Sequence, residues 1–176
     1  LYALEIKGEA TDSAVVMTFI DLEMAEVRTI ETPIVIPTYR TSTSLGSTTT
    51  IAVDGGLNVA ADGNYTLPFG SDVEEALSGV KMDPATAGLP IDGFDGEVVG
   101  LWYLGTWNTE VDPAWSFSVD SLDGVEAGES LKVLTGDYVG NNWVEEGSAT
   151  VQEDGSVSSD AGTGLSFLST LVLIKE

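Results

Sequence analysis

The sequence predicts an all-β protein, an antiparallel β-sandwich with at most one short helix. Helical periodicity is almost absent, because most of the chain either alternates polar and apolar residues or runs in β-branched stretches. Asp-Gly pairs recur between these stretches, and glycine accepts the positive φ that tight hairpin turns require. Short strands broken by such turns about every 8–12 residues are typical of a sandwich or barrel.

Strands are expected where the alternation or the β-branched character persists. They cover residues 2–7, 14–21, 25–30, 34–39, 48–53, 64–67, 98–104, 114–120, 130–135, 143–151 and 168–174. The one expected helix covers residues 72–77, with Ser71 as its cap and two glutamates in its first turn. The Ser/Thr-rich segment 41–50 is expected to form a loop or an exposed edge strand.

A single domain is expected over residues 1–176, because neither half is long enough to bury a comfortable core alone. The segment 81–95 contains Pro84, Pro90 and glycines, which predict a long connection. Any subdivision of the domain is expected there.

The charge balance narrows the range of partners. The chain has 29 acidic and 6 basic residues, a net charge of −23. Nucleic acid and anionic membrane surfaces are disfavoured, because both need clustered cations and the basic residues here are scattered. No apolar run approaches the roughly 20 residues of a membrane helix, so no membrane insertion is expected. Three explanations of the acidity stay open: a high-salt habitat, calcium in the extracellular medium, or a surface that must stay hydrated.

The residue types argue against catalysis. The chain has neither cysteine nor histidine, so disulfides, the usual nucleophile–base pairs and imidazole metal sites are excluded. Paired carboxylates could in principle hydrolyse glycosides, but with 29 acidic residues some pair always lies at a suitable distance. The prediction is a protein that is not an enzyme.

Two acidic turns are candidate calcium sites, because hard cations prefer several oxygen ligands. One contains Asp92, Asp95 and Glu97, and the other contains Asp54 and Asp62. Neither matches the twelve-residue calcium loop pattern. The alternative is that both are hairpin turns with solvated carboxylates.

Carbohydrate binding and glycosylation each have candidate residues. Trp107 lies in an expected loop beside Asn and Asp, as in sites where aromatic rings stack on sugars, and Trp102 and Trp115 lie near it in sequence. The latter two fall in expected strands, where a core position is the default, and Trp107 is the one expected to be exposed. Asn64 begins an Asn-Tyr-Thr sequon beside an expected turn, which predicts an accessible N-glycosylation site.

The last 60 residues carry an ordered set of turns and core positions. The segments are AWSFSV at 114–119, the run from Gly124 through AGESLKVL to 134, NWVEEGSATV at 142–151, EDGSV at 153–157 and GLS at 164–166. This order resembles the β-sandwich modules that recur in long bacterial and archaeal cell-surface proteins. The resemblance implies a secreted or surface-displayed spacer, scaffold or adhesive unit, and it carries over no catalytic residue.

The strand expected at 143–151 makes physical sense without that resemblance. Trp143, Ala149 and Val151 share one face of a regular strand and are expected to point to the core. Gly147 in mid-strand predicts a bulge or a close approach by a neighbouring backbone.

Self-association is the predicted mode of action within the structural class. Segments 1–7 and 168–175 are strand-like and lie at the two ends of the chain, where a strand can add to a neighbour's sheet edge. The alternative is that both pair internally. The predicted function is a structural or adhesive extracellular module, such as a subunit of a surface layer or filament, with further copies or other cell-surface proteins as partners. A carbohydrate-binding module is the alternative.

Overall fold

The computed structural model describes the whole chain except residues 11, 24–26, 69–74 and 107. It confirms an all-β, antiparallel, sandwich-like fold. In the described part of the chain the only helical element is a single 3-10 turn, Asp54–Gly56. No helix among those residues is long and apolar enough to cross a bilayer.

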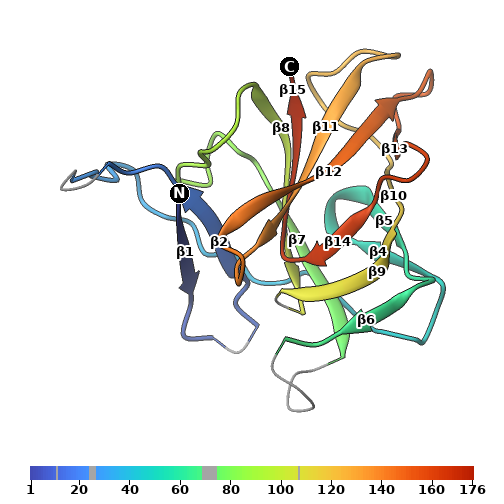
Figure 1. Cartoon of the computed structure of the whole chain (residues 1–176), viewed down its shortest axis with the longest axis horizontal. Coiled ribbons are helices and arrows are strands. Elements are labelled where there is room, and N and C mark those ends of the chain that lie inside the picture. Colours follow the sequence, from blue (N-terminus) through green and yellow to red (C-terminus); the bar gives the residue numbers. More distant parts are fainter. Residues whose placement is uncertain (11, 24–26, 69–74, 107) are drawn as a thin grey trace.

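A ten-stranded sheet forms the body of the molecule and curls into a nearly closed barrel (Figure 1). Its strands in spatial order are β3 (Thr41–Ser44), β7 (Ala76–Met82), β8 (Glu97–Gly105), β15 (Thr170–Lys175), β11 (Ser130–Asp137), β12 (Asn142–Val151), β13 (Val157–Ser159), β10 (Phe117–Val119), β5 (Leu57–Ala60) and β4 (Thr50–Val53). Strands from both sides of the connection at 81–95 therefore lie in one sheet.

Two smaller sheets complete the fold. The strands β6 (Asn64–Thr66), β9 (Thr109–Trp115) and β14 (Leu165–Leu168) form a three-stranded sheet that packs on the interior of the barrel. The strands β1 (Tyr2–Lys7) and β2 (Val15–Ile20) form a hairpin that lies against the outside of the barrel, next to β8 and β15 (Figure 1).

The central strands of the barrel are buried on both faces because side chains alternate along a strand. On β8, Trp102 and Leu104 point into the barrel, whereas Leu101 and Tyr103 point outward beneath the hairpin. The side chains inside the barrel form the inner core. Those between the barrel, the hairpin and the loops around residues 30–39 and 82–94 form the outer core.

Three local predictions are wrong. Residues 34–39 form no strand, because Pro33 and Pro37 lack amide protons for a ladder and the isoleucines between them pack into the outer core instead. Residues 27–30 of the segment expected at 25–30 are irregular as well, and 25 and 26 lie outside the described residues. The end of the expected helix 72–77 is strand, since Ala76 and Leu77 begin β7, while residues 72–74 are not described.

The bulge predicted at Gly147 is confirmed. Val133 of β11 pairs with Gly147, but the next residue, Leu134, pairs with Glu145, so Glu146 is an extra residue on β12. Gly147 has φ +117°, and a Cβ there would lie 2.3 Å from the Thr163 hydroxyl. The extra residue reverses the alternation of side chains along the rest of the strand.

Candidate functional site

Two of the three tryptophans considered for sugar binding, Trp102 and Trp115, are not exposed. Trp102 is fully buried and Trp115 is 1% exposed, both as members of the inner core. Their rings cannot stack on a ligand from solvent, so their candidacy as sugar-binding residues is wrong and they take the core position that is the default for their strands. Trp107 lies outside the described residues.

The acidic residues proposed for calcium are dispersed. No three Asp or Glu side chains in the described part of the chain converge on a point where a metal ion could sit. Asp62, Asp95 and Glu97 are exposed on or beside turns. Calcium binding by these residues therefore stays a prediction that no cluster in the described residues supports.

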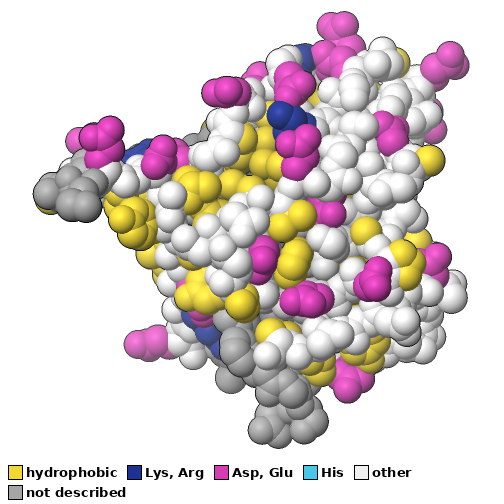
Figure 2. Space-filling view, in the orientation of Figure 1, with side chains coloured by type: hydrophobic (Ala, Val, Ile, Leu, Met, Phe, Trp, Pro, Cys, Tyr) yellow, Lys and Arg dark blue, Asp and Glu magenta, His cyan; other side chains and the backbone are white. Residues whose placement is uncertain are grey.

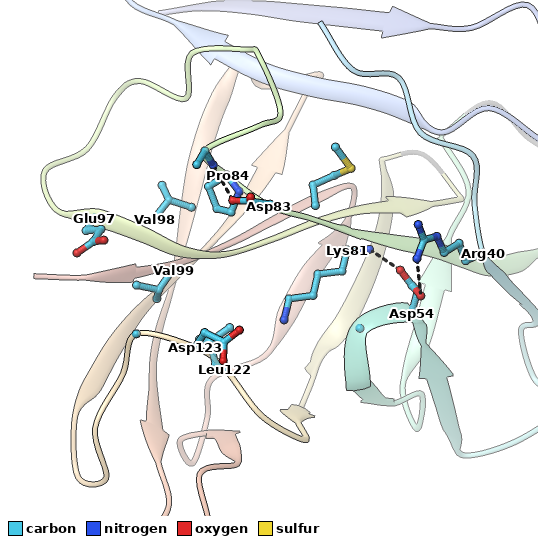
Figure 3. Close-up of a pocket in the computed structure, with 14 residues that line it drawn as sticks. Arg40, Asp54, Lys81, Asp83, Pro84, Glu97, Val98, Val99, Leu122 and Asp123 are labelled. Carbon is cyan, nitrogen blue, oxygen red and sulfur yellow. Dashed lines mark hydrogen bonds and ion pairs between the residues drawn. The ribbon is translucent and has the colours of Figure 1, made fainter.

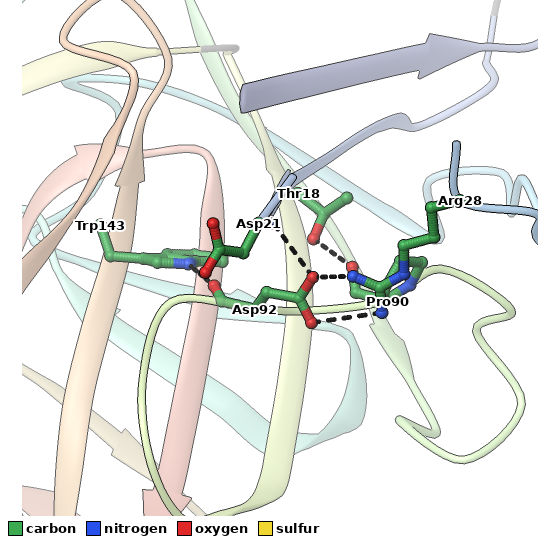
Figure 4. Close-up of polar contacts among 6 residues, drawn as sticks. All are labelled: Thr18, Asp21, Arg28, Pro90, Asp92 and Trp143. Carbon is green, nitrogen blue, oxygen red and sulfur yellow. Dashed lines mark hydrogen bonds and ion pairs between the residues drawn. The ribbon is translucent and has the colours of Figure 1, made fainter. Parts of the chain in front are cut away.

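Asp92 instead fastens three segments together (Figure 4). Its carboxylate accepts the Asp21 amide at 3.1 Å and forms an ion pair with Arg28. Its backbone carbonyl accepts the indole N–H of Trp143 at 2.7 Å. The clasp at Asp92 thus ties the end of β2, the loop that follows β2, and β12 around the rim of the outer core.

Asn64 is exposed at the start of β6, opposite Asp112 of β9. Its side chain has no hydrogen bond to any residue the structure describes. Glycosylation there stays a prediction.

The two ends of the ten-stranded sheet meet at Asp54 and leave a groove of about 570 Å³ (Figure 3). The Asp54 amide donates to the Thr41 hydroxyl of β3 at 3.2 Å. The Asp54 carboxylate accepts the Lys81 amide of β7 at 3.0 Å and lies 4.0 Å from the Arg40 guanidinium. Asp54 therefore bridges the barrel seam with backbone and side-chain contacts.

Lys81 and Arg40 are the basic residues in the lining of this seam groove, and of the two Arg40 pairs with Asp54. The aliphatic stem of Lys81 lies on Gly55, where a Cβ would stand 2.4 Å from the Lys81 Cδ. Its ammonium lies 5.4 Å from the centre of the Trp102 ring. Figure 3 shows the side chain extending away from Arg40 toward the segment with Leu122 and Asp123.

The hairpin β1–β2 is a second candidate site, because its two outer edges differ. Along β2 each of the three outward residues has a backbone group bonded to the body of the molecule. The bonds are Val15 N–H to the Tyr39 hydroxyl (3.3 Å), the Thr170 hydroxyl to the Met17 carbonyl (2.7 Å) and Asp92 N–H to the Phe19 carbonyl (3.1 Å). Bonds to the body of the molecule therefore occupy this edge along its whole length.

The outer edge of β1 is held only at its N-terminal end. Asn141 accepts the Ala3 N–H at 2.7 Å and donates to the Leu1 carbonyl at 3.0 Å. In an antiparallel pair, alternate residues turn their backbone groups toward the partner strand. Since the Ala3 N–H faces Asn141, the same outward set includes Glu5 and Lys7. The outward groups of these two residues bond to nothing in the described part of the chain.

The basic residues without a carboxylate partner among the described residues lie at the same two candidate sites, the edge of β1 and the seam groove. Four of the six basic residues pair with carboxylates, namely Arg28, Arg40, Lys132 and Lys175. Lys7 and Lys81 have no ion pair with any residue that the structure describes. Acidic side chains are spread over the face that Figure 2 shows, and the chain has 29 of them, so a cation without a carboxylate partner is notable.

Both terminal segments are strands, and both pair internally, which is the alternative that the sequence left open. Addition to a neighbour's sheet stays a prediction. The C-terminal strand β15 lies between β8 and β11, so both of its edges are used inside the sheet. Of the two terminal strands, only β1 keeps an open edge. Sequence reasoning missed the seam groove, because its lining comes from segments far apart in the chain, around Arg40, Lys81 and Asp123.

No family model, curated protein or solved structure matches this chain. The likeness of the last 60 residues to cell-surface modules stays a prediction.

Proposed function

We propose that this chain is a non-enzymatic structural or adhesive module of the cell exterior, which joins a neighbouring molecule by strand addition at the edge of β1. The observation that carries the proposal is the open backbone edge at Glu5 and Lys7, on a strand whose other edge is fully paired. An added strand would complete this ladder with backbone hydrogen bonds that need no particular side chain.

The surroundings of the edge favour a protein partner. Leu1 is 40% exposed and Tyr2 is 57% exposed, although both are large apolar residues. Val139, in the turn that carries Asn141, is 71% exposed. Exposed apolar side chains beside an unpaired strand are typical of an interaction surface.

The acidity of the chain fits an assembly that depends on cations in the medium. Copies that each carry a charge of −23 repel one another, and screening by salt reduces this repulsion. Calcium would act in this proposal by general screening or by bridging acidic turns.

The test is the mass in solution of the wild type and of Glu5→Pro, measured by light scattering behind a sizing column in low salt, high salt, calcium and chelator. Proline removes the outward N–H of Glu5 and is tolerated on an edge strand. Glu5→Gln, which keeps that N–H, is the matched control. We expect species above the 18.4 kDa monomer for the wild type and the control, and fewer for Glu5→Pro. A wild type that stays monomeric throughout would refute the proposal.

Carbohydrate binding is a second candidate function, now at the seam groove. The unpaired Lys81 ammonium favours a sugar that bears a single carboxylate, while Asp83, Glu97 and Asp123 in the lining disfavour polyanions. Titration with glucuronic acid, with glucose as the neutral control, should change the tryptophan fluorescence of the wild type and not that of Lys81→Met. Equal responses to the two sugars would refute it.

A further inference from the structure

We infer that the partner of the β1 edge is β1 of a second copy, paired antiparallel about a two-fold axis at Ile6. This rests on the proposed function, and it adds the identity of the partner and the register of the ladder. The register places Glu5 opposite Lys7 of the other copy, Ile6 opposite Ile6, and Lys7 opposite Glu5.

The geometry of an antiparallel ladder limits the possible registers. Two residues that exchange hydrogen bonds across such a pair must both turn their backbone groups outward. On β1 these residues are Ala3, Glu5 and Lys7. Only registers that set these residues opposite one another give a bonded ladder between two copies.

The hydrogen bond between Ala3 and Asn141 excludes most of these registers. The Ala3 N–H already donates to Asn141 Oδ1, so it is not free for a carbonyl of a second copy. A register that pairs Ala3 with Ala3, Glu5 or Lys7 would have to break that bond. The remaining ladders use Glu5 and Lys7 alone, because their outward N–H groups bond to no described residue.

Charge then selects one register. Pairing Glu5 with Glu5, or Lys7 with Lys7, would set like charges directly opposite, which destabilises a strand pair. Pairing Glu5 with Lys7 sets opposite charges together twice, once on each side of the axis. Lysine on an edge strand discourages indiscriminate pairing, and a glutamate opposite it relieves that penalty.

The axis position also suits the apolar face of β1. Ile6 is half-buried and packs against the outer core together with Leu4. In the inferred pair the two Ile6 residues form a non-hydrogen-bonded pair, in which side chains come closest. Each covers the remaining exposed part of the other, so the outer cores of the two copies become continuous.

The short ladder predicts a weak dimer. Three directly opposed residue pairs bury much less than the roughly 1,200–2,000 Å² of a stable interface, so dimerisation should depend strongly on protein concentration. It should strengthen with moderate salt, because the repulsion between two copies of charge −23 is long-ranged and is screened first.

The test is a charge exchange measured by sedimentation velocity at fixed salt. Glu5→Lys and Lys7→Glu each create two like-charge pairs and should weaken dimerisation about tenfold. The double variant E5K/K7E restores opposite charges and should recover the wild-type dissociation constant. Both side chains are exposed on the monomer, so the fold should be unaffected.

The matched control is Glu153→Lys, an exposed residue after β12. It changes the net charge by the same amount as Glu5→Lys, and by reducing general repulsion it should strengthen association slightly. If Glu5→Lys weakens dimerisation and Glu153→Lys does not, the effect comes from the pairing of Glu5 with Lys7 and not from the change in net charge.

Two results would overturn the inference in distinguishable ways. Assembly that is lost in Glu5→Pro but is unaffected by the charge exchange would refute the two-fold register and leave strand addition intact. A wild type that is monomeric at every concentration and salt would refute both.

Discussion

The inner core and the outer core share the central strands of one sheet, yet they are enclosed differently. The inner core is surrounded by the barrel, and strands from every part of the sheet contribute to it. The outer core is closed by one hairpin and two irregular loops, and many of its apolar members are only partly buried. Stability should therefore reside mainly in the barrel, with the hairpin as a layer that depends on it.

This difference bears on function. The barrel leaves its strands little freedom, because the sheet is nearly closed and its two ends meet at Asp54. The hairpin carries the open edge at Glu5 and Lys7. The region with the weaker enclosure is thus the region available to a partner.

The largest expected effect is damage to the inner core. Trp102→Ala removes a fully buried ring and its hydrogen bond to the Asp54 carbonyl at the seam. We expect a loss of about 3–5 kcal/mol in the free energy of unfolding, measured by urea denaturation. Protection from hydrogen exchange should fall in the barrel and the hairpin together. If protection were lost only in the hairpin, the stability of the hairpin would not depend on the barrel as we infer.

A substitution in the outer core should lower the free energy of unfolding by less. Leu4→Ala shortens a half-buried side chain of β1 and should cost about 1–2 kcal/mol. Hydrogen exchange should speed up in β1 and β2 while the barrel strands β11 and β15 keep their protection. Equal loss in both regions would mean that the two cores unfold as one unit.

Breaking the clasp at Asp92 tests how the hairpin is held. Asp92→Ala removes the partner of Arg28 and of the Asp21 amide, both of which are partly solvated, and should cost about 1 kcal/mol. Limited proteolysis should cut the loop after β2 faster than in the wild type. Arg28→Ala is the control that tests the ion pair alone, and it should have the lesser effect.

Tyr103→Phe should raise the stability of the outer core, whereas the other substitutions lower stability. The Tyr103 hydroxyl is buried in the outer core without a hydrogen bond to the described residues, and burial raises its pKa to about 12. Removing an unsatisfied hydroxyl should stabilise the protein by about 0.5–1 kcal/mol in denaturant titrations. Destabilisation would show that an ordered water or another group satisfies this hydroxyl.

The smallest effect is a pH dependence at the far end of the barrel. The Ser148 and Thr150 hydroxyls donate to the Asp160 carboxylate at 2.5 and 2.7 Å, which lowers its pKa. A lowered folded-state pKa stabilises the protein above the unfolded value near 3.9, and the benefit is lost as pH falls through the folded value. Asp160→Asn should therefore be less stable than the wild type at pH 7, and the gap should narrow below about pH 4. A gap that is constant with pH would exclude this role.

Local chemistry was enough to predict most of the elements. The alternation at 2–7 and at 143–151 gave strands that match β1 and β12 closely. The glycine at 147 signalled the bulge, since few other residues adopt φ +117°. Composition alone limited the possible chemistry, because the chain has neither cysteine nor histidine.

Side-chain direction could not be predicted through that bulge. Trp143 and Ala149 share a face in a regular strand, but Glu146 is an extra residue between them. Trp143 therefore belongs to the outer core and Ala149 to the inner core. The sequence signalled a bulge, but the position of the extra residue depends on the pairing with β11.

An acidic, all-β chain with turns at its Asp-Gly pairs could be predicted from the residues alone, because strands and turns follow from nearby residues. Tertiary structure decided which terminal strand stays open, since β1 and β15 look alike as sequences. Their fates differ because β15 finds partners on both sides from residues far away in the chain, whereas β1 finds only β2. Pairing of this kind is a long-range property that local chemistry does not encode.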